Sequence, residues 1–276
     1  MFDPSHTINM AQPINWQHPL NRGLISRWKV LPLSSHGTTW RDICGRHQAA
    51  LTNTPTWQGP LGRPNSTGSL LLNGSTQRGR VTNTPLLNPS TITVSAWIKV
   101  IGIDVIQAIC SKDDYSASGA QRVWQFRVNA SNVIQFIPFN ASTNGSYAGT
   151  VTVNDSKWHH VAGTWDGVTI YVYVDGKRDG AGSAYSGSLR TGQTNAVTIG
   201  DDDTADGVGD TPADFFSGNM DDICLYNRAL STSELAQLYV LSRQSASPLL
   251  QYVPSITKAG AIISAFSPRR LLSGVG

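Results

Sequence analysis

The clearest pattern in the chain is a two-residue alternation of apolar and polar positions. In residues 91–100, TITVSAWIKV, apolar side chains recur at every second position from Ile92 to Val100. Successive side chains of a strand point to opposite faces, so this period is typical of a strand with one buried face. Residues 168–174, VTIYVYV, repeat it, with valine and isoleucine on one face and threonine and tyrosine on the other. Both segments are predicted to be β-strands.

Shorter segments of the same character occur along most of the chain, separated by turn residues. Further strands are predicted at 23–30, 69–73, 105–110, 122–128, 132–137, 147–153, 157–165, 196–200 and 219–226. Residues 31–67 hold many turn residues and are predicted to be a long irregular connection. One helix is predicted to follow Ser231, because Glu234 three positions later completes a capping box. Many short strands with almost no helix indicate an all-β fold, an antiparallel two-sheet sandwich.

The two ends of the chain lack this alternation. Residues 1–22 and 242–276 are punctuated by proline, so we expect two extended arms that flank a body formed by residues 23–241. Residues 1–47 carry a net charge of +3 and residues 242–276 carry +4, which leaves −4 between them. We therefore expect basic arms that contact sister copies or other proteins of an assembly.

Composition excludes several classes of protein. A net charge of only +3 argues against general nucleic-acid binding. No apolar run is long enough to span a bilayer, and the first residues, MFDPSHTINM, do not resemble a secretory signal. The odd number of cysteines, three, argues against a complete disulfide framework. We expect neither a nucleic-acid nor a membrane partner, and a protein that is made and assembled in a host cytoplasm.

Two stretches resemble the laminin-G-like, concanavalin A-like sandwich family. One runs from ITVSAWIKV to KWHHVAGTWDGVTIYVYVDGKRDG, and the other is FFSGNMDDICLYNRALSTSELAQLY. The order and spacing of these motifs match the family over about residues 69–240. The resemblance implies a jelly roll of two curved antiparallel sheets. It implies less about function, because members include glycan binders, adhesion modules and spacers.

His159 and His160 lie near several carboxylates and raise the question of a catalytic or metal-binding hairpin. The two residues are consecutive in a predicted strand, so their side chains leave opposite faces. They cannot chelate one ion together in that geometry. We therefore expect a structural role, with one ring at the sheet surface bonded to a turn.

The resemblance also extends to some glycoside hydrolases, which usually need two placed carboxylates. Members of this fold group use glutamates that lie close together on one strand. The chain has one glutamate, Glu234, and we expect it to cap a helix. A hydrolase is therefore the weakest of the functions considered, and we expect no enzyme.

Calcium binding is the stronger hypothesis for a bound ion. Asp221 shares its predicted strand face with Ile223 and Leu225, and a lone carboxylate among apolar side chains is costly. In similar sandwiches the corresponding aspartate often helps to hold a structural calcium with an early strand end, which corresponds here to Asn73 and Gly74. Calcium favours such oxygen ligands. Hydrogen bonds from main-chain amides are the open alternative.

Two weaker binding hypotheses concern a loop and two aromatic residues. The aspartate-rich loop that follows residue 200 offers Asp201, Asp203 and Asp206 to calcium or to a basic partner, although a solvated loop is the alternative. Trp124 and Tyr147 are candidates for stacking on a sugar, with packing inside the sheet as the default.

Three functions from different classes follow from these observations. The first is a non-enzymatic structural protein, such as a bacteriophage capsid decoration or appendage protein, located in the virion and anchored by its arms. The second is a calcium-assisted glycan-binding adhesion module at a cell surface. The third is a glycoside hydrolase.

Overall fold

Strand β7 (Ile92–Val100) shows how the sequence pattern becomes structure. In the computed structural model of the chain, its alternate apolar residues from Ile92 to Val100 are fully buried between two sheets. Strand β12 pairs antiparallel with one edge of β7 and strand β17 with the other, which places β7 in the centre of its sheet. The structure describes residues 14–31, 37–102, 105–113, 121–202, 214–244 and 249.

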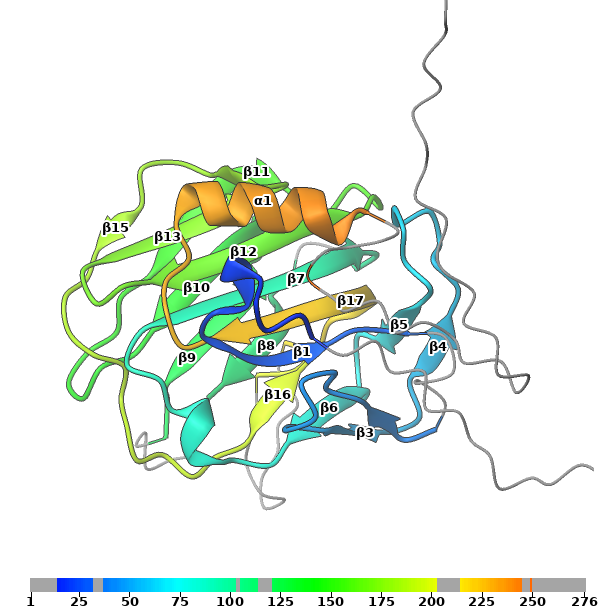
Figure 1. Cartoon of the computed structure of the whole chain (residues 1–276), viewed down its shortest axis with the longest axis horizontal. Helices are drawn as coiled ribbons and strands as arrows, with labels where there is room; N and C mark the ends of the chain where they lie inside the picture. The colour runs from blue at the N-terminus through cyan, green and yellow to red at the C-terminus, as the bar shows by residue number, and fades with distance from the viewer. Residues whose placement is uncertain are drawn as a thin grey trace, which may run out of the picture.

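Over these residues the first sheet has nine strands (Figure 1). They are β1 (Leu24–Trp28), β4 (Thr56–Gln58), β5 (Ser69–Asn73), β7, β12 (His159–Trp165), β13 (Thr169–Val174), β14 (Lys177–Arg178), β15 (Ser183–Ala184) and β17 (Ser217–Tyr226). Their order is β14-β13-β12-β7-β17-β5-β4, with β1 also paired to β17 and β15 to β13. All of these pairs are antiparallel.

The second sheet has eight strands within the same described ranges. They are β2 (Thr39–Trp40), β3 (Ala49–Thr52), β6 (Arg78–Val81), β8 (Gln107–Lys112), β9 (Trp124–Val128), β10 (Val133–Pro138), β11 (Tyr147–Thr152) and β16 (Val197–Ile199). Their order is β11-β10-β9-β8-β16-β6-β3-β2. Strands β2, β3 and β4 lie in the segment predicted to be irregular. That prediction is wrong because strands of two to four residues are too short to show a period.

The main core lies between the two sheets and confirms the predicted antiparallel sandwich. It contains four fully buried tryptophans, Trp28, Trp40, Trp124 and Trp165. Gly163 of β12 faces Phe136 of β10 across this core, and a Cβ atom there would lie 2.7 Å from the ring. The absence of a side chain at Gly163 therefore lets the sheets approach each other.

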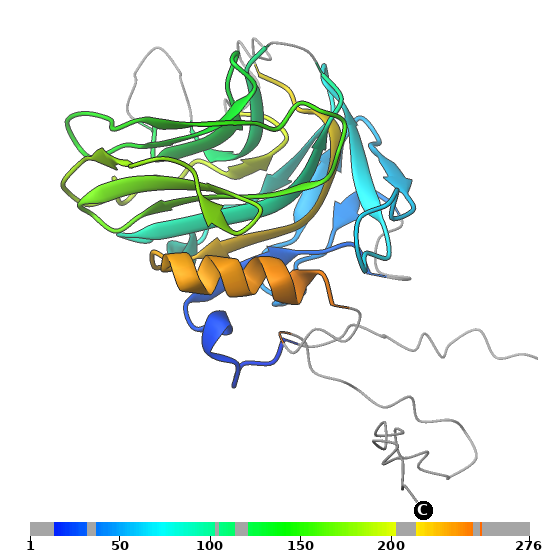
Figure 2. The same ribbon diagram turned by 90° about the horizontal axis from the view of Figure 1, so that it is seen from above.

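A second apolar cluster covers the outer face of the nine-stranded sheet. Helix α1 (Thr232–Ser242) begins with the predicted capping box of Ser231 and Glu234 and packs Leu235 and Leu238 on this sheet. The 3₁₀ helix η1 (Pro19–Asn21) lies beside it, and a second one, η2 (Pro85–Leu87), follows β6 (Figure 2). In the part of the chain that the structure describes, no helix is long and apolar enough to cross a bilayer.

The residues just before β1 belong to this second cluster. Ile14 and Leu20, which the sequence assigned to the amino-terminal arm, are 2% exposed there. Asn15 N donates to Leu249 O at 3.0 Å, and Asn21 Nδ2 donates to the same oxygen at 2.9 Å. The segment from Ile14 onward therefore packs on the body. Residues 1–13 and 250–276 lie outside the described residues.

Candidate functional site

His159 and His160 leave β12 on opposite faces, as the strand period predicts. His159 Nδ1 lies 2.9 Å from Asp175 Oδ2 in the turn after β13. His160 is buried on the α1 side, with its ring centroid 5.5 Å from that of Trp97. The hydrogen bond with Asp175 raises the pKa of His159, whereas burial lowers the pKa of His160 to about 4. The two rings point apart, so they do not form one metal site together.

A β-bulge in β17 reverses the predicted direction of Asp221. Asp222 has a φ of 55°, and β17 gains one residue there relative to β7. Asp221 therefore lies opposite Trp97, on the face that α1 covers, while Ile223 and Leu225 point into the core. The sequence placed Asp221 on the same face as those two residues. That prediction is wrong because a bulge adds a residue without a partner and shifts the alternation.

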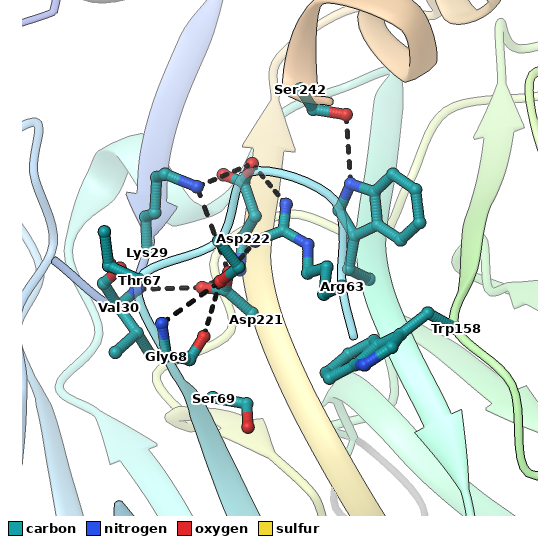
Figure 3. Close-up of polar contacts among 12 residues, drawn as sticks. Lys29, Val30, Arg63, Thr67, Gly68, Ser69, Trp158, Asp221, Asp222 and Ser242 are labelled. Carbon is teal, nitrogen blue, oxygen red and sulfur yellow. Dashed lines mark hydrogen bonds and ion pairs between the residues drawn. The ribbon is translucent and has the colours of Figure 1, made fainter. Parts of the chain in front are cut away.

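The carboxylate of Asp221 is fully buried and enclosed by donors (Figure 3). Its Oδ1 accepts hydrogen bonds from the main-chain nitrogens of Val30 and Asp222, both at 2.8 Å. Its Oδ2 accepts one from Ser66 Oγ at 2.8 Å and contacts the Arg63 guanidinium. Donors and a cation can stabilise a buried carboxylate without a metal ion. These contacts match the alternative that the sequence left open beside calcium.

Asn73 and Gly74, the other two predicted calcium ligands, lie at the far end of the same strand pair. Asn73 is paired with Ser217, four positions before Asp221, or about 13 Å away at the usual strand rise. Its Oδ1 accepts hydrogen bonds from three main-chain amides of the turn that follows β5. Across the described ranges, no three His, Cys, Asp or Glu side chains are grouped to hold a metal ion.

Asp221 belongs to a buried charge cluster, defined here as Arg27, Lys29, Arg63, Asp221 and Asp222. Arg27 Nε and Nη2 donate to the two oxygens of Asp222 at 2.6 and 2.9 Å. Burial alone would raise the pKa of Asp222, but Arg27 and Lys29 outweigh it and hold the pKa well below its usual value. Burial lowers the pKa of Lys29 to about 8. With side chains at most 9% exposed, the cluster is a closed clamp between β1 and β17.

The end of α1 closes the clamp from outside. The Arg63 guanidinium lies 4.9 Å from the centroid of the Trp97 ring, and Trp97 stacks on Tyr239 of α1 at 5.7 Å. Trp97 Nε1 donates to Ser242 Oγ at 3.0 Å (Figure 3). A ligand that reached the charge cluster from this side would have to displace α1.

The remaining predicted ligands are separated in the structure. Asp201 is fully buried, and its Oδ2 accepts from Arg78 Nη1 at 2.6 Å. Asp203 and Asp206 lie outside the described residues. Trp124 is fully buried in the main core and is not a surface ring for a sugar. Tyr147 packs partly against the same core and donates its hydroxyl to Asp179 O.

The outer face of the eight-stranded sheet carries a different polar group, which we call the outer polar face. Its members are Asp113, Arg122, Gln125, Arg127, Gln135, Asp202 and Asp214. Gln125 and Arg127 alternate along β9 with core residues, and Gln135 of β10 is paired with Arg127. The three carboxylates come from segments that adjoin β8, β16 and β17. Among the described residues, no helix covers this sheet on its outer side, because α1 and η1 pack on the other one.

A continuous set of contacts links these side chains. Gln125 Nε2 donates to Asp113 Oδ2 at 2.6 Å and to Asp202 Oδ2 at 3.1 Å. Arg127 Nε donates to Gln135 Oε1 at 2.9 Å, and Arg127 Nη1 lies 3.9 Å from Asp214 Oδ2. Planar amide and guanidinium groups thus alternate with carboxylates across three neighbouring segments. Such groups can form hydrogen bonds with hydroxyl-rich ligands.

The carboxylates of this face are unfavourably placed for stability. Burial, followed by Asp214 and Asp113, raises the pKa of Asp202 to about 8. Burial also raises the pKa of Asp214 and lowers that of Arg127. Asp113 and Gln125 are buried, whereas the other members of this face are half-buried. Perturbed titratable groups gathered in one place are characteristic of functional sites. The outer polar face is therefore the candidate site.

Part of this face is visible in the sequence as an alternation of polar and apolar residues. In residues 124–128, WQFRV, polar Gln125 and Arg127 alternate with apolar residues, and Gln135 does the same in the next strand. The alternation shows which side chains point outward. It does not show that the aspartates from distant segments join them.

The geometry of the sandwich agrees with comparisons to known proteins. The family model described as concanavalin A-like lectin/glucanases superfamily matches residues 73–236, more than half of the chain. The chain belongs to the concanavalin A-like lectin/glucanase superfamily. As a member of this superfamily, it has the two-sheet architecture that the motif resemblance implied.

Curated relatives match a small part of this superfamily member. It is 32% identical over 89 residues, or 32% of its length, to the Sushi, von Willebrand factor type A, EGF and pentraxin domain-containing protein 1 of Rattus norvegicus. The Mus musculus protein of the same name matches equally well. The chain spans only 2% of the length of these relatives.

Solved structures of similar fold include a binding domain, a sialidase and a domain of an arabinanase. The binding domain of Paraclostridial Mosquitocidal Protein 1 superposes with a TM-score of 0.59 at 14% identity, covering 80% of this chain and 52% of that one. Trypanosoma rangeli sialidase in complex with sialic acid gives 0.56 at 19%, covering 80% and 33%. Domain 4 of AbnA, an extracellular arabinanase from Geobacillus stearothermophilus, in complex with arabinotriose, gives 0.53 at 17%, covering 78% and 98%.

Proposed function

We propose that this chain is a non-catalytic carbohydrate-binding module that takes its ligand on the outer polar face. The main support is the linked set of amide, guanidinium and carboxylate groups on the outer side of the eight-stranded sheet. No helix among the described residues covers this side. Two structures of similar fold are complexes with sugars: the sialidase, matched over 33% of its chain, with sialic acid, and domain 4 of AbnA with arabinotriose. A sugar offers hydroxyls as both donors and acceptors, and this face supplies both counterparts.

Two of the described carboxylates, Glu234 and Asp113, are held in ways that do not suit hydrolysis. The one glutamate, Glu234, receives hydrogen bonds from Arg228 and Ser231 and caps α1 on the opposite side of the molecule. On the outer polar face, Asp113 accepts two hydrogen bonds from Arg122, at 2.8 and 2.9 Å, and another from Gln125. A carboxylate held in this way is a weak nucleophile and a weak base.

A glycan array followed by calorimetry tests the proposal. Gln135 is half-buried, and its partners among the described residues are the side chains of Arg127 and Ser146, so Gln135→Ala removes a ligand contact with little effect on the core. We expect a loss of affinity of roughly tenfold. The matched control is Arg178→Ala on β14 of the other sheet, which should bind as the unchanged chain does. Binding of no sugar, or equal losses in both variants, would contradict the proposal.

Calcium assistance is tested in the same titrations. The predicted ligands do not converge in the described residues, so we propose that the sugar affinity is independent of calcium. Titrations with added calcium and with a chelator should give the same affinity. A chelator-sensitive affinity would return calcium to the site.

A second candidate function is anchoring in a larger assembly, such as a virion. One observation favours it: Asn15 and Leu249 meet outside the nine-stranded sheet, on the opposite side of the sandwich from the outer polar face. If the chain is anchored through residues 1–13 and 250–276, which adjoin these two residues in the sequence, the outer polar face would point away from the assembly. Chains lacking residues 1–13 or 250–276 should fold and bind sugar but fail to co-assemble. Full occupancy of an assembly by both truncated chains would contradict this candidate.

A further inference from the structure

Among the described residues, one carboxylate of the outer polar face, Asp202, forms no ion pair. Three aspartates in this region each face an arginine: Asp201 faces Arg78, Asp113 faces Arg122 and Asp214 faces Arg127. Asp202 has no ion pair among the described residues. Its contacts are the Gln125 amide at 3.1 Å and a side-chain hydrogen bond with Asp214. Asp202 and Asp214 are therefore two adjacent carboxyl groups that have one arginine, Arg127, between them.

An unpartnered hydroxyl lies on the same face. Ser111 of β8 is paired directly with Gln125 of β9, so the two side chains point to the same side of the sheet. Ser111 is fully buried, and its Oγ has no hydrogen-bond partner among the residues that the structure describes. A buried hydroxyl without a partner costs free energy, and a ligand atom can satisfy it. This observation is independent of the charges and points to a bound polar group.

The two features together specify the missing group. A group that satisfies Asp202, Asp214 and Ser111 must carry positive charge and several hydrogen-bond donors. A primary ammonium has both, with three donors on one nitrogen. A divalent metal ion fits less well, because no three acidic or metal-ligating side chains of the described residues are grouped to hold one.

We propose that the carbohydrate bound on the outer polar face is an amino sugar with a free, positively charged amino group, which Asp202 and Asp214 receive. This inference rests on the proposed carbohydrate-binding function and names its ligand class. Gln125, Arg127 and Gln135 contact the neighbouring hydroxyls of the same ligand. In the free protein, a proton occupies the place of the ammonium, which agrees with the raised pKa of Asp202.

The test compares two sugars that differ only at the amino group. Oligomers of β-1,4-linked glucosamine and of N-acetylglucosamine, equal in length, are titrated into the full chain by calorimetry with a chelator present. We expect the free-amine oligomer to bind at least roughly tenfold more tightly, because acetylation removes the charge. Asp202→Asn should abolish this preference, since the amide keeps the shape without the charge.

A matched variant separates local charge from net charge. Asp166→Asn removes the same charge from an exposed turn between β12 and β13, where Asp166 accepts only main-chain hydrogen bonds. It should retain the preference for the free amine. Equal affinities for the two oligomers, or a preference that survives Asp202→Asn, would overturn the amino-sugar inference and leave carbohydrate binding intact.

Two further outcomes are equally decisive. If neither oligomer nor any sugar of an array binds, the proposed carbohydrate function fails and this inference fails with it. A lysine-rich peptide is the competing source of ammonium groups. If it binds more tightly than the glucosamine oligomer and loses affinity in Asp202→Asn, the site recognises protein and the amino-sugar inference is wrong.

Discussion

Arg27 and Asp222 form a two-point ion pair between adjacent strands β1 and β17, with Nε–Oδ1 and Nη2–Oδ2 distances of 2.6 and 2.9 Å. Both side chains are 2% exposed. The pair forms because the β-bulge at Asp222 lets two consecutive aspartates contact the three cations of the buried charge cluster. It therefore joins the first strand of the described chain to the last.

Removing Asp222 should destabilise the fold strongly. In Asp222→Ala, Arg27 stays buried without its counterion, and we expect the free energy of unfolding to fall by about 3–5 kcal/mol. Urea denaturation at neutral pH measures this change. The control is Lys157→Ala, which breaks the exposed pair with Asp155 and should leave the denaturation midpoint unchanged. A midpoint shift in Asp222→Ala no larger than that control's would show that the clamp is not structural.

The pKa values of the adjacent histidines should be shifted in opposite directions. Histidine NMR signals should give a pKa near 4 for His160, because of burial, and one above 6.5 for His159, because of Asp175. The stability that His160 contributes is present above its unfolded pKa of 6.5 and is lost as the pH falls towards about 4, at a cost of up to roughly 3 kcal/mol. The contribution of His159 is present below pH 6.5 and is lost as the pH rises through its folded pKa. Equal pKa values for the two rings would contradict their placement on opposite faces of β12.

Asp202 should make the protein less stable as the pH rises. Its folded pKa is about 8 against 3.8 for an ordinary aspartate, so the folded state holds a proton that the unfolded state releases. The stability contribution is complete below pH 3.8 and is lost as the pH rises through about 8. Asp202→Asn removes this loss, so its melting temperature should exceed that of the unchanged chain more at pH 8 than at pH 4. A constant difference between the two curves would show that Asp202 ionises normally.

Asp179 should protect an edge of the eight-stranded sheet. Its carboxylate accepts hydrogen bonds from the main-chain nitrogens of Thr150 and Val151 in the edge strand β11, at 2.9 and 3.0 Å. Asp179→Ala leaves these groups unpaired, and we expect a loss of about 2–4 kcal/mol and self-association through the freed edge. Denaturation and light scattering measure the two effects. Gly149→Ala should act similarly, because its Cβ would collide with the same carboxylate; if both variants stay monomeric and stable, the edge is not protected in this way.

Much of the fold follows from local pattern. The alternation of residues 91–100 set the face of every side chain in β7, and the capping box located the start of α1. The same alternation predicted the opposite directions of His159 and His160. These features depend on neighbouring residues, which is why a single sequence reveals them.

The candidate site was less accessible to prediction because it depends on contacts between distant segments. The bulge at Asp222 is one residue long, yet it places Asp221 on the opposite face of β17 from the one that the sequence predicted. Trp124 was a candidate for stacking on a sugar, with packing inside the sheet as the default; the default holds, and the alternation WQFRV places Trp124 with core residue Phe126. The contact between Asp202 and Asp214 depends on where β16 ends and where β17 begins, which no local pattern predicts.

The contact of Asn15 and Asn21 with Leu249 O has a mechanical consequence. Tension applied between the residues at these two points would be carried first by a few hydrogen bonds outside the sheets. The load would reach the strands of the sandwich only after these hydrogen bonds had broken. Under such a load, the hydrogen bonds to Leu249 O would break before the strands separate, and the outer polar face would keep its shape.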